Sequence, residues 1–417
     1  MIRSPARGLF QQSARSEEKL QTPDSQTVNR IVTQELYMVD REERYGAIVL
    51  GVGGMGSATA YHLARRGVDV LGLERFDVPH AKGSSHGITR IIRRAYYEHP
   101  SYIPLIERAY DLWDDLEDRT GRRLLHVTGS VDAGPPDSDV FAGSRRSCEE
   151  HGIDHEVLTA EELHERFPGY RLPDDYRALY QPDGGFLVPE QCIVAHTEAA
   201  LEAGAVVRAR EPVTDWSPTG DGGVRVETEK GEYVADELVV TAGAWNADFV
   251  DGLQGLAVPE RQVLAWFQPE VPDRFEPENF PVWNLRTPAG RFYGFPVYDV
   301  PGFKLGKYHH RDEQVDPDDW HREPEPEDER LLRDFTERYF PDAAGPTVRL
   351  ATCMFTNTPD KHFVLDSLPD APQVAVGAGF SGHGFKFASV IGEILADLAV
   401  DGRTDHPIDM FRLDRFD

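Results

Sequence analysis

The sequence has few cysteines, few lysines and no long apolar run. Its three Cys, at positions 148, 192 and 353, are odd in number and far apart, so they form neither a disulfide framework nor a C-x-x-C site. No stretch approaches the roughly 18 apolar residues that a membrane helix needs, and no apolar segment near the start marks a secretory signal. We therefore expect a soluble, cytoplasmic protein that does not act at a membrane.

The basic residues are almost all arginine. Only seven of the 44 basic residues are Lys, and with 72 acidic residues the net charge is −28. A strongly negative protein repels nucleic-acid phosphates and anionic membranes, so neither is an expected partner. This acidic, Lys-poor composition predicts a halophilic source, with the codon preference of a GC-rich genome as the alternative. No metal site is predicted.

The length and the apolar content predict a large folded body behind a short tail. A chain of 417 residues with 40% hydrophobic residues is large enough for two domains and excludes wholesale disorder. Residues 1–44 are rich in Gln, Ser and Arg and show little periodicity. We expect these residues to form a disordered N-terminal tail.

A strand, a helix and a second strand follow one another at the start of the folded body. Residues 47–52 form an apolar run of strand type, and residues 55–66 have the spacing of a helix that stops at a glycine. Residues 68–73 form the second apolar run, which ends at Glu74. This order predicts a βαβ unit.

Gly51, Gly53 and Gly56 spell G-x-G-x-x-G between the first strand and the helix. The first glycine permits the tight turn, the second lets a pyrophosphate approach the backbone, and the third lets helix and strand pack closely. Glu74 lies at the end of the second strand, where a carboxylate accepts hydrogen bonds from ribose hydroxyls. The four residues predict a dinucleotide site, and the acid disfavours NADP.

The later elements favour FAD over a nicotinamide cofactor. The expected elements are helices over 102–118, 193–202, 328–339 and 383–398, a β-meander over 206–241 and antiparallel strands over 258–316. A glycine loop with Gly382 and Gly384 opens the last helix and closes on the cofactor, with the helix N-terminus directed at the flavin. The predicted fold class is α/β, a Rossmann-type FAD-binding domain with a second α+β substrate domain on an antiparallel sheet.

Several longer segments resemble the monomeric sarcosine oxidase/N-methyltryptophan oxidase family. The resemblance covers about residues 45–412, and its motifs include SSHGITRIIRRAY (84–96), GGFLVPEQC (184–192), FKLGKYHH (303–310), CMFTNTPDKHFVLD (353–366) and GFSGHGFKF (379–387). It implies a monomer that oxidises a secondary amino acid with FAD and oxygen and releases an aldehyde and hydrogen peroxide. The expected FAD-binding domain comprises 45–125, 186–258 and 359–417, and the substrate domain comprises 126–185 and 259–358.

The resemblance also implies roles for particular residues. Cys353 matches the cysteine that forms a thioether to the flavin, and Arg90 matches an arginine close to the flavin ring. Lys304 matches the lysine that activates oxygen, where a cation stabilises developing negative charge. Arg93 and Lys386 match the pair that binds the substrate carboxylate.

The remaining matches leave some choices open. His309 matches the active-site histidine of the family, but the segment carries one extra residue, so His310 is the alternative. Tyr293 and Tyr96 match aromatic residues near the substrate, and packing alone also explains them. Phe355 stands where sarcosine oxidases have Tyr, which favours a bulkier N-methyl or cyclic amino acid. The other functions considered are a dehydrogenase that passes electrons to a carrier and an accessory flavin subunit.

Overall fold

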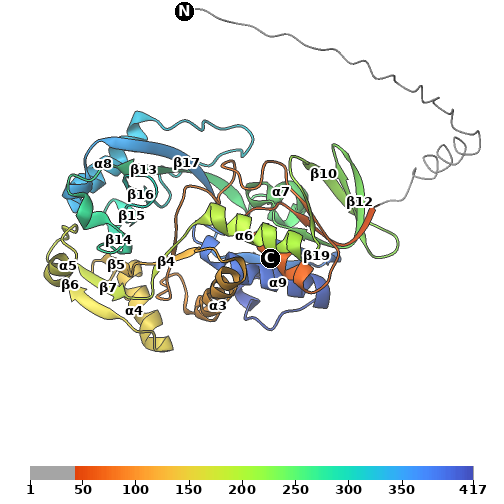
Figure 1. Cartoon of the computed structure of the whole chain (residues 1–417), viewed down its shortest axis with the longest axis horizontal. Helices are drawn as coiled ribbons and strands as arrows, with labels where there is room; N and C mark the ends of the chain where they lie inside the picture. Colours follow the sequence, from red (N-terminus) through yellow and green to blue (C-terminus); the bar gives the residue numbers. More distant parts are fainter. Residues whose placement is uncertain (1–42, 417) are drawn as a thin grey trace, which may run out of the picture. The chain divides into compact units, whose positions relative to one another are not determined.

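Two large β-sheets carry the part of the chain that the computed structural model describes, residues 43–416 (Figure 1). The predicted disordered tail lies almost entirely outside these residues. The first sheet consists of β1 (Glu43–Leu50), β2 (Val70–Leu73), β9 (Val206–Arg208), β10 (Val213–Pro218), β11 (Val224–Thr228), β12 (Gly231–Val240), β18 (Val364–Leu368) and β19 (Ala371–Ala378). In it β1, β2 and β9 run parallel, whereas β10, β11 and β12 form the predicted antiparallel meander.

The predicted βαβ unit is confirmed as β1, α2 (Gly54–Arg65) and β2. Successive residues of β1 face opposite sides of the sheet, as the period of a strand requires. Val49 packs toward the helices, and Ile48 packs into the core on the other face. Both side chains are fully buried. Burial on both faces explains why the sequence shows an unbroken apolar run here instead of alternation.

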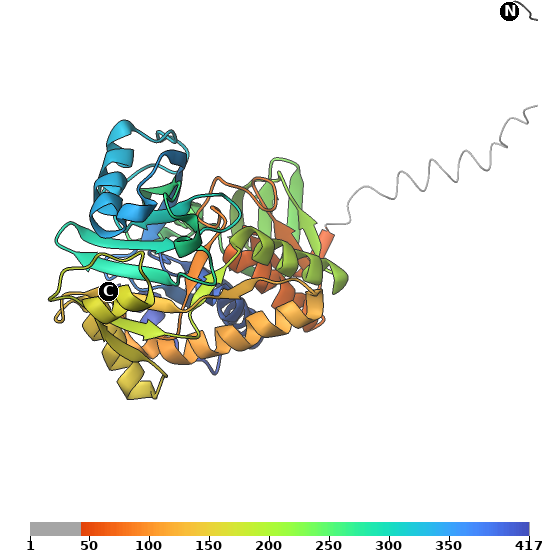
Figure 2. The ribbon, with the colours of Figure 1, turned by 60° about the vertical axis from the view of Figure 1, so that its left-hand side comes forward.

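Helices cover the face of the first sheet that Val49 occupies. They are α2, α3 (Ile103–Thr120), α6 (Pro189–Glu202) and α9 (Ala388–Asp401). Figure 2 shows α3 as the long orange helix along the lower side of the described part. The sequence predicts the last helix over 383–398, but α9 begins at Ala388, five residues after the predicted start. Ser381 and Gly382 adopt left-handed backbone angles, with φ of 47° and 78°, and a 3-10 turn at Phe385–Phe387 precedes the helix. The glycine loop is thus irregular where a helix start was expected.

The second sheet forms the other half of the described fold. Its strands are β5 (Ser130–Gly134), β6 (Glu156–Thr159), β7 (Arg177–Gln181), β13 (Val258–Phe267), β14 (Val282–Thr287), β15 (Gly290–Phe295), β16 (Phe303–Lys307) and β17 (Thr347–Asn357). It is antiparallel as expected, apart from the parallel pair of β5 and β14. That pair joins segments distant in sequence, so no hairpin turn sets its direction. α8 (Pro326–Tyr339) packs on this sheet, with the Phe335 ring stacked 3.7 Å from that of Phe292.

Shorter elements complete the described chain. They are β3 (Arg90–Ile92), β4 (Leu125–Val127), α4 (Asp139–His151), α5 (Ala160–Arg166), β8 (Gly185–Leu187) and α7 (Asn246–Phe249). β3, β8 and β4 form a small third sheet. Within residues 43–416 no helix is both long and apolar enough to cross a membrane. The division into two domains given above stays a prediction.

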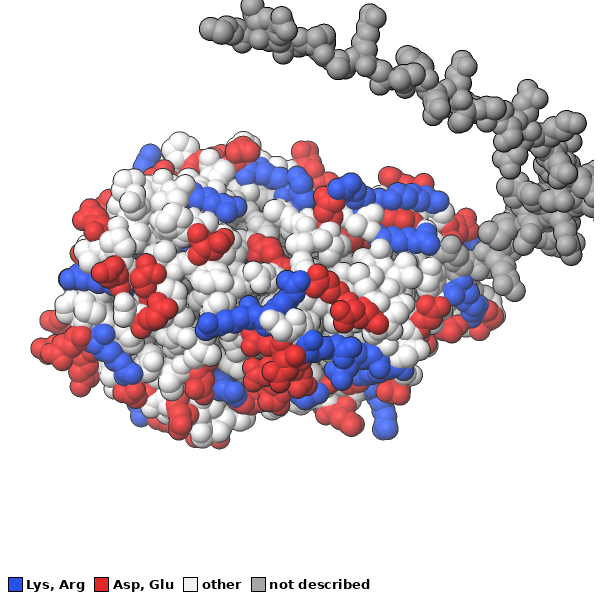
Figure 3. Space-filling model, viewed as in Figure 1, with Lys and Arg blue, Asp and Glu red and all other residues white. Residues whose placement is uncertain are grey.

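Arginine side chains on the surface lie next to carboxylates (Figure 3). Arg66 contacts Asp397 at 2.5 Å, and Arg108 contacts Glu393 at 2.7 Å. Exposed pairs of this kind contribute little stability each. The halophilic source inferred from the composition stays a prediction.

Candidate active site

A cavity of about 480 Å³ is lined by residues from both large sheets. One end of it includes the glycine turn after β1, and the other includes Tyr293 of β15 and Lys386 of the turn before α9. Cys353 and Phe355 of β17 line it as well. The cavity therefore joins a nucleotide-binding turn to a chamber with aromatic walls, a common setting for a cofactor and its substrate.

The glycine turn has the geometry that dinucleotide binding requires. Gly51 has a φ of 88°, in the region that favours glycine. A Cβ on Gly56 would lie 1.8 Å from the carbonyl oxygen of Gly51, whereas one on Gly53 would meet nothing within 4 Å. Gly56 thus permits close packing, and Gly53 leaves open space toward the cavity. The N-terminus of α2 begins beside this space and carries no side-chain cap, so its amide groups can receive phosphates.

Glu74 closes the nucleotide end of the cavity. Its carboxylate accepts hydrogen bonds from the amides of Val52, at 2.9 Å, and Phe76, at 2.8 Å. These bonds fix a buried carboxylate in the cavity wall with lone pairs left for ribose hydroxyls. Together with the glycine turn, Glu74 fits the adenosine half of FAD.

Gly56 permits a first prediction. The variant Gly56→Ala should lose most of its bound FAD, because the added methyl group collides with backbone and separates α2 from β1. Gly220→Ala is the matched control, since a Cβ there meets nothing within 4 Å. The flavin-to-protein absorbance ratio of the two purified variants measures the effect. Equal flavin content would contradict the assigned role.

Cys353 and Arg90 lie together in the cavity wall. The Arg90 guanidinium lies 3.9 Å from the Cys353 sulfur and donates to the carbonyl of Ser84 at 2.6 Å. Burial raises the pKa of the Cys353 thiol, and the charge of Arg90 opposes that rise. A cation beside a thiol favours the nucleophilic thiolate. The pair can thus supply a thiolate to an electrophile in the cavity.

Lys304 lies behind the loop that precedes β3, outside the cavity wall. Its ammonium donates to the carbonyls of Gly87, at 2.6 Å, and Thr89, at 2.9 Å, and to the Thr89 hydroxyl at 2.8 Å. The side chain is only 2% exposed. Burial lowers its pKa well below the usual value, and the charge of Arg90 lowers it further.

Lys386 is the cation that reaches the substrate end of the cavity. Its ammonium donates to the carbonyl of His383 at 2.6 Å. Burial and the nearby Arg93 lower its pKa to about 7. The His383 ring donates from Nε2 to the carbonyl of Lys361, at 2.9 Å, so its Nδ1 accepts from the Tyr96 hydroxyl at 2.5 Å. The Tyr96 hydroxyl therefore donates its proton to His383, and a role of Tyr96 near the substrate stays a prediction.

Aromatic side chains form the wall of the substrate end. The Tyr293 and Tyr308 rings meet edge to face with centroids 5.0 Å apart, and the Phe355 ring lies 5.6 Å from that of Tyr308. Arg291 stacks on the far face of this wall, 3.5 Å from the Tyr308 ring centre. Burial raises the pKa of Tyr293, so its hydroxyl stays protonated.

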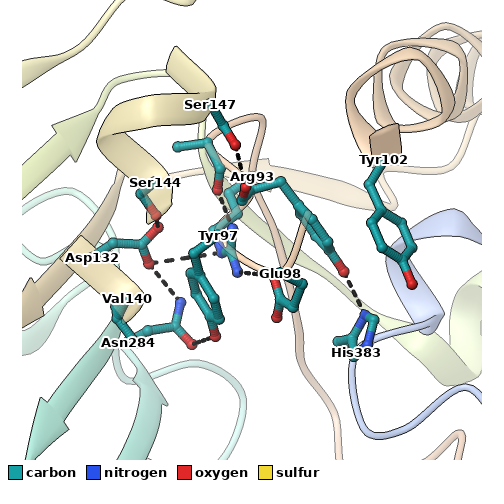
Figure 4. A network of polar contacts seen from close by, with 12 residues as sticks. Arg93, Tyr97, Glu98, Tyr102, Asp132, Val140, Ser144, Ser147, Asn284 and His383 are labelled. Carbon is teal, nitrogen blue, oxygen red and sulfur yellow. Dashed lines mark hydrogen bonds and ion pairs between the residues drawn. The ribbon is translucent and has the colours of Figure 1, made fainter. Parts of the chain in front are cut away.

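Arg93 is buried, and it is not among the residues that line the cavity. Figure 4 shows its polar contacts. Its guanidinium contacts the Glu98 carboxylate at 3.1 Å and lies 3.7 Å from that of Asp132. Burial would raise the pKa of Glu98, but Arg93 and other cations outweigh it and bring that pKa to about 2. Arg93 and Lys386 both lie over the Tyr96 ring, at 4.9 and 5.2 Å from its centre. The structure thus brings the predicted pair together around one ring, with only Lys386 in the wall.

Neither candidate histidine lies in the cavity wall. His309, with a φ of 53°, bonds to the Glu260 carboxylate at 2.9 Å. His310 is fully buried, and its Nε2 lies 3.1 Å from Asp328. Burial lowers the pKa of His310 to about 4. The choice between the two histidines stays a prediction.

Sequence reasoning missed several polar groups around the site. Asp132 is buried on β5 and accepts hydrogen bonds from Ser144, at 2.6 Å, and Asn284, at 2.8 Å. An acid inside an apolar strand was the one available signal for it. Glu98 lies in a loop and has no such signal. Gly382 and Gly384 line the cavity, and a Cβ on them would meet the side chains of Phe355 and Phe380 within 2.6 Å. Their role in binding the cofactor stays a prediction.

The fold and the site define a flavin-dependent oxidoreductase. The family described as FAD dependent oxidoreductase matches residues 47–398, and the chain belongs to this family. It is 43% identical to monomeric sarcosine oxidase from Streptomyces avermitilis over 372 residues, 88% of this chain and 96% of that protein. It is 38% identical to N-methyl-L-tryptophan oxidase from Escherichia coli strain K12 over 379 residues, 89% of this chain and all of that protein. The resemblance found in the sequence is thereby confirmed.

Solved structures agree with this assignment. NikD, described as an unusual amino acid oxidase essential for nikkomycin biosynthesis, superposes with a TM-score of 0.76 at 29% identity. The match covers 89% of this chain and 97% of NikD. L-proline dehydrogenase from P. horikoshii has the same fold, with a TM-score of 0.77 at 21% identity.

Proposed function

We propose that this protein oxidises secondary amino acids, either N-methyl or cyclic, with oxygen as the electron acceptor. The observation that carries the proposal is the single cavity with a nucleotide-binding turn at one end and Lys386 among aromatic rings at the other. The names of the relatives, sarcosine oxidase and N-methyltryptophan oxidase, support the same substrate class. An oxidation of this kind yields an imine. Water hydrolyses the imine of an N-methyl amino acid to an aldehyde and the free amino acid, whereas a cyclic amino acid gives a cyclic imine.

FAD, when bound, supplies the chemistry by accepting a hydride equivalent from the substrate and passing two electrons to oxygen, which forms hydrogen peroxide. The residues that would hold it are Gly51, Gly53 and Glu74 at the nucleotide end and Cys353 through a thioether. Arg90 favours the Cys353 thiolate because it lies 3.9 Å from the sulfur.

The substrate carboxylate is assigned to Lys386, because this cation lies in the cavity wall and, within residues 43–416, its ammonium has no carboxylate in direct contact. Arg93 lies one layer behind, where Glu98 and Asp132 hold it. The apolar faces of Tyr293, Tyr308 and Phe355 receive the N-alkyl group and the side chain. Fixed contacts at both ends orient the reacting C–H bond, which supplies much of the rate.

Lys304 is assigned to the reaction with oxygen. A buried ammonium stabilises the negative charge that develops on oxygen during reduction. Because Lys304 lies behind the loop from the cavity, it leaves the substrate chamber free. His309 remains a candidate for a supporting role through Glu260.

A substrate panel tests the proposal. Under nitrogen, N-methyl and cyclic amino acids should bleach the flavin absorbance, and primary amino acids should not. Admission of air should then restore the colour with one hydrogen peroxide per flavin. Bleaching without peroxide, together with fast dye reduction, would indicate the dehydrogenase instead. No bleaching by any secondary amine would overturn the proposal.

Lys386 gives a second prediction. Lys386→Met should lower kcat/KM by about 100-fold, because a charge-assisted bond to a desolvated carboxylate is lost. In the unaltered protein, the binding of propionate, which has no amine to titrate, should weaken as the pH rises above about 7, the pKa of Lys386. The sign follows because the ammonium, and not the amine, attracts a carboxylate. Propionate titrations followed by flavin absorbance measure this, and a flat profile between pH 6 and 9 would contradict it.

A further inference from the structure

Lys304 is a buried cation that lacks an anionic partner in direct contact. All three hydrogen bonds of its ammonium go to neutral oxygens of Gly87 and Thr89. Within residues 43–416 no carboxylate comes within ion-pair distance of it. An isolated ammonium in such a place loses its proton easily, since burial penalises the charged form. A negatively charged group nearby would therefore favour the protonated form of Lys304.

Glu190 holds the other side of the same loop. This residue lies in the first turn of α6, and its Oε1 accepts hydrogen bonds from the amides of Gly87, at 2.7 Å, and Ile88, at 3.1 Å. The second oxygen, Oε2, lies 3.3 Å from the Ile88 amide. These amides are the only backbone groups of the described chain to which the carboxylate bonds.

Glu190 and Lys304 form hydrogen bonds to opposite ends of one peptide group. The carbonyl of Gly87 and the amide of Ile88 belong to the same planar unit, and in a trans peptide they point in opposite directions. The carboxylate holds the positive N–H end, and the ammonium holds the negative C=O end. The aligned peptide dipole therefore lies between the two charges and favours both.

The turn at Gly87 and Ile88 needs contacts that fix its backbone. Gly87 has a φ of 95°, and Ile88 has a φ of 77°. A β-branched residue rarely adopts a positive φ, and it stays there only where surrounding contacts enforce it. The amide of Thr89 donates to the carbonyl of Gly87 at 2.9 Å and closes the turn across Ile88. Glu190 on the amide side and Lys304 on the carbonyl side add to this restraint.

We propose that Glu190 is a positioning residue of the oxidative half-reaction. It acts through the Gly87–Ile88 peptide to orient the Lys304 side chain and to favour its protonated form. The inference rests on the proposed role of Lys304 with oxygen. The groups that face Lys304 are His86 on the adjoining loop, Arg90 at the start of β3, Arg349 and Cys353 on β17, and Glu190 on α6. Arg90 and Arg349 oppose its charge and burial keeps His86 neutral, whereas Glu190 and Cys353 favour the ammonium, with Glu190 the stronger of the two and the only carboxylate in this set.

The test compares Glu190→Gln with Lys304→Met in stopped flow. Flavin reduction by substrate under nitrogen should change less than twofold in both. Reoxidation of Glu190→Gln by oxygen should be about tenfold slower near pH 8. Without the carboxylate the Lys304 ammonium loses its proton more easily, so the inflection in the plot of reoxidation rate against pH moves down by about one unit. Lys304→Met should be slow at every pH and show no inflection. Glu198→Gln, at an exposed residue of α6 paired with Arg122, is the matched control and should match the unaltered protein.

A structural readout separates placement from charge. Hydrogen exchange of the segment 84–92 should be faster in Glu190→Gln than in Glu198→Gln, because the amide of Ile88 loses its charged acceptor. The double variant Glu190→Gln/Ile88→Gly should keep the lowered inflection, since glycine adopts a positive φ without strain while the charge at position 190 is still absent. It also tests the inference if the single variant folds poorly.

The outcomes distinguish the two proposals. If Lys304→Met reacts slowly with oxygen while Glu190→Gln keeps the original rate and inflection, the inference about Glu190 is wrong. If Lys304→Met itself reoxidises at the original rate, the oxygen role of Lys304 is wrong, whatever Glu190→Gln does.

Discussion

Replacing Lys304 with Met should slow the reaction of the reduced protein with oxygen by about 10²- to 10³-fold, the usual effect of removing one preorganised charge from a developing anion. The substitution keeps the volume of the side chain and removes its charge and three hydrogen bonds. Flavin reduction by substrate should stay within twofold, because Lys304 lies outside the cavity wall. Stopped-flow absorbance, with the two half-reactions measured separately, checks both statements.

Lys307→Met is the matched control for this variant. Lys307 ends the same strand, three residues on, and its ammonium donates to the carbonyl of His310 at 3.2 Å. The reduced flavin of Lys307→Met should react with oxygen at the rate of the unaltered protein. If both lysine variants slowed equally, a general disturbance of β16 would explain the result and the oxygen role would fail.

Replacing Cys353 with Ala should abolish covalent attachment of the flavin. The cavity contains no other cysteine among the residues that line it, since Cys148 and Cys192 are buried elsewhere. After acid precipitation, the flavin of the unaltered protein should stay with the pellet, and that of the variant should appear in the supernatant. Absorbance of the two fractions measures the change from full to no retention.

Cys192→Ala serves as the control, because Cys192 is equally buried but lies in α6. Its flavin should stay with the pellet. A second comparison, Arg90→Met, should slow covalent attachment, because the cation that most strongly opposes the raised pKa of the thiol is then lost. Flavin in the supernatant of the unaltered protein would show that no thioether forms.

The local features of the sequence predicted the nucleotide end of the site well. The turn at Gly51 and Gly53 depends on backbone angles and close approach, which particular residue types reveal within a few positions. Glu74 was predictable for the same reason, since it ends a strand of the same βαβ unit. The helix after the turn differs from its predicted range by one residue at each end.

The substrate end was predicted only in part. Lys386 lies in the cavity wall as the motif implied, but Arg93 lies behind it, because Glu98 and Asp132 hold its guanidinium from other elements. No pattern in the sequence brings β5 next to Arg93. The expected helix start near His383 was wrong, since the left-handed angles at Ser381 and Gly382 keep the loop irregular.

By itself, the sequence determined the FAD-binding turn, the family and the identity of the reactive candidates Cys353, Lys304 and Lys386, because each depends on residue type within a short segment. Only the tertiary structure decided which cations face the cavity, which carboxylates hold them, and that Glu190 and Lys304 grip one peptide group from opposite sides. Several of those relations join residues far apart in the sequence, Glu190 and Gly87 by 103 positions and Lys304 and Gly87 by 217. Burial and charge at such contacts follow from packing that no local pattern encodes.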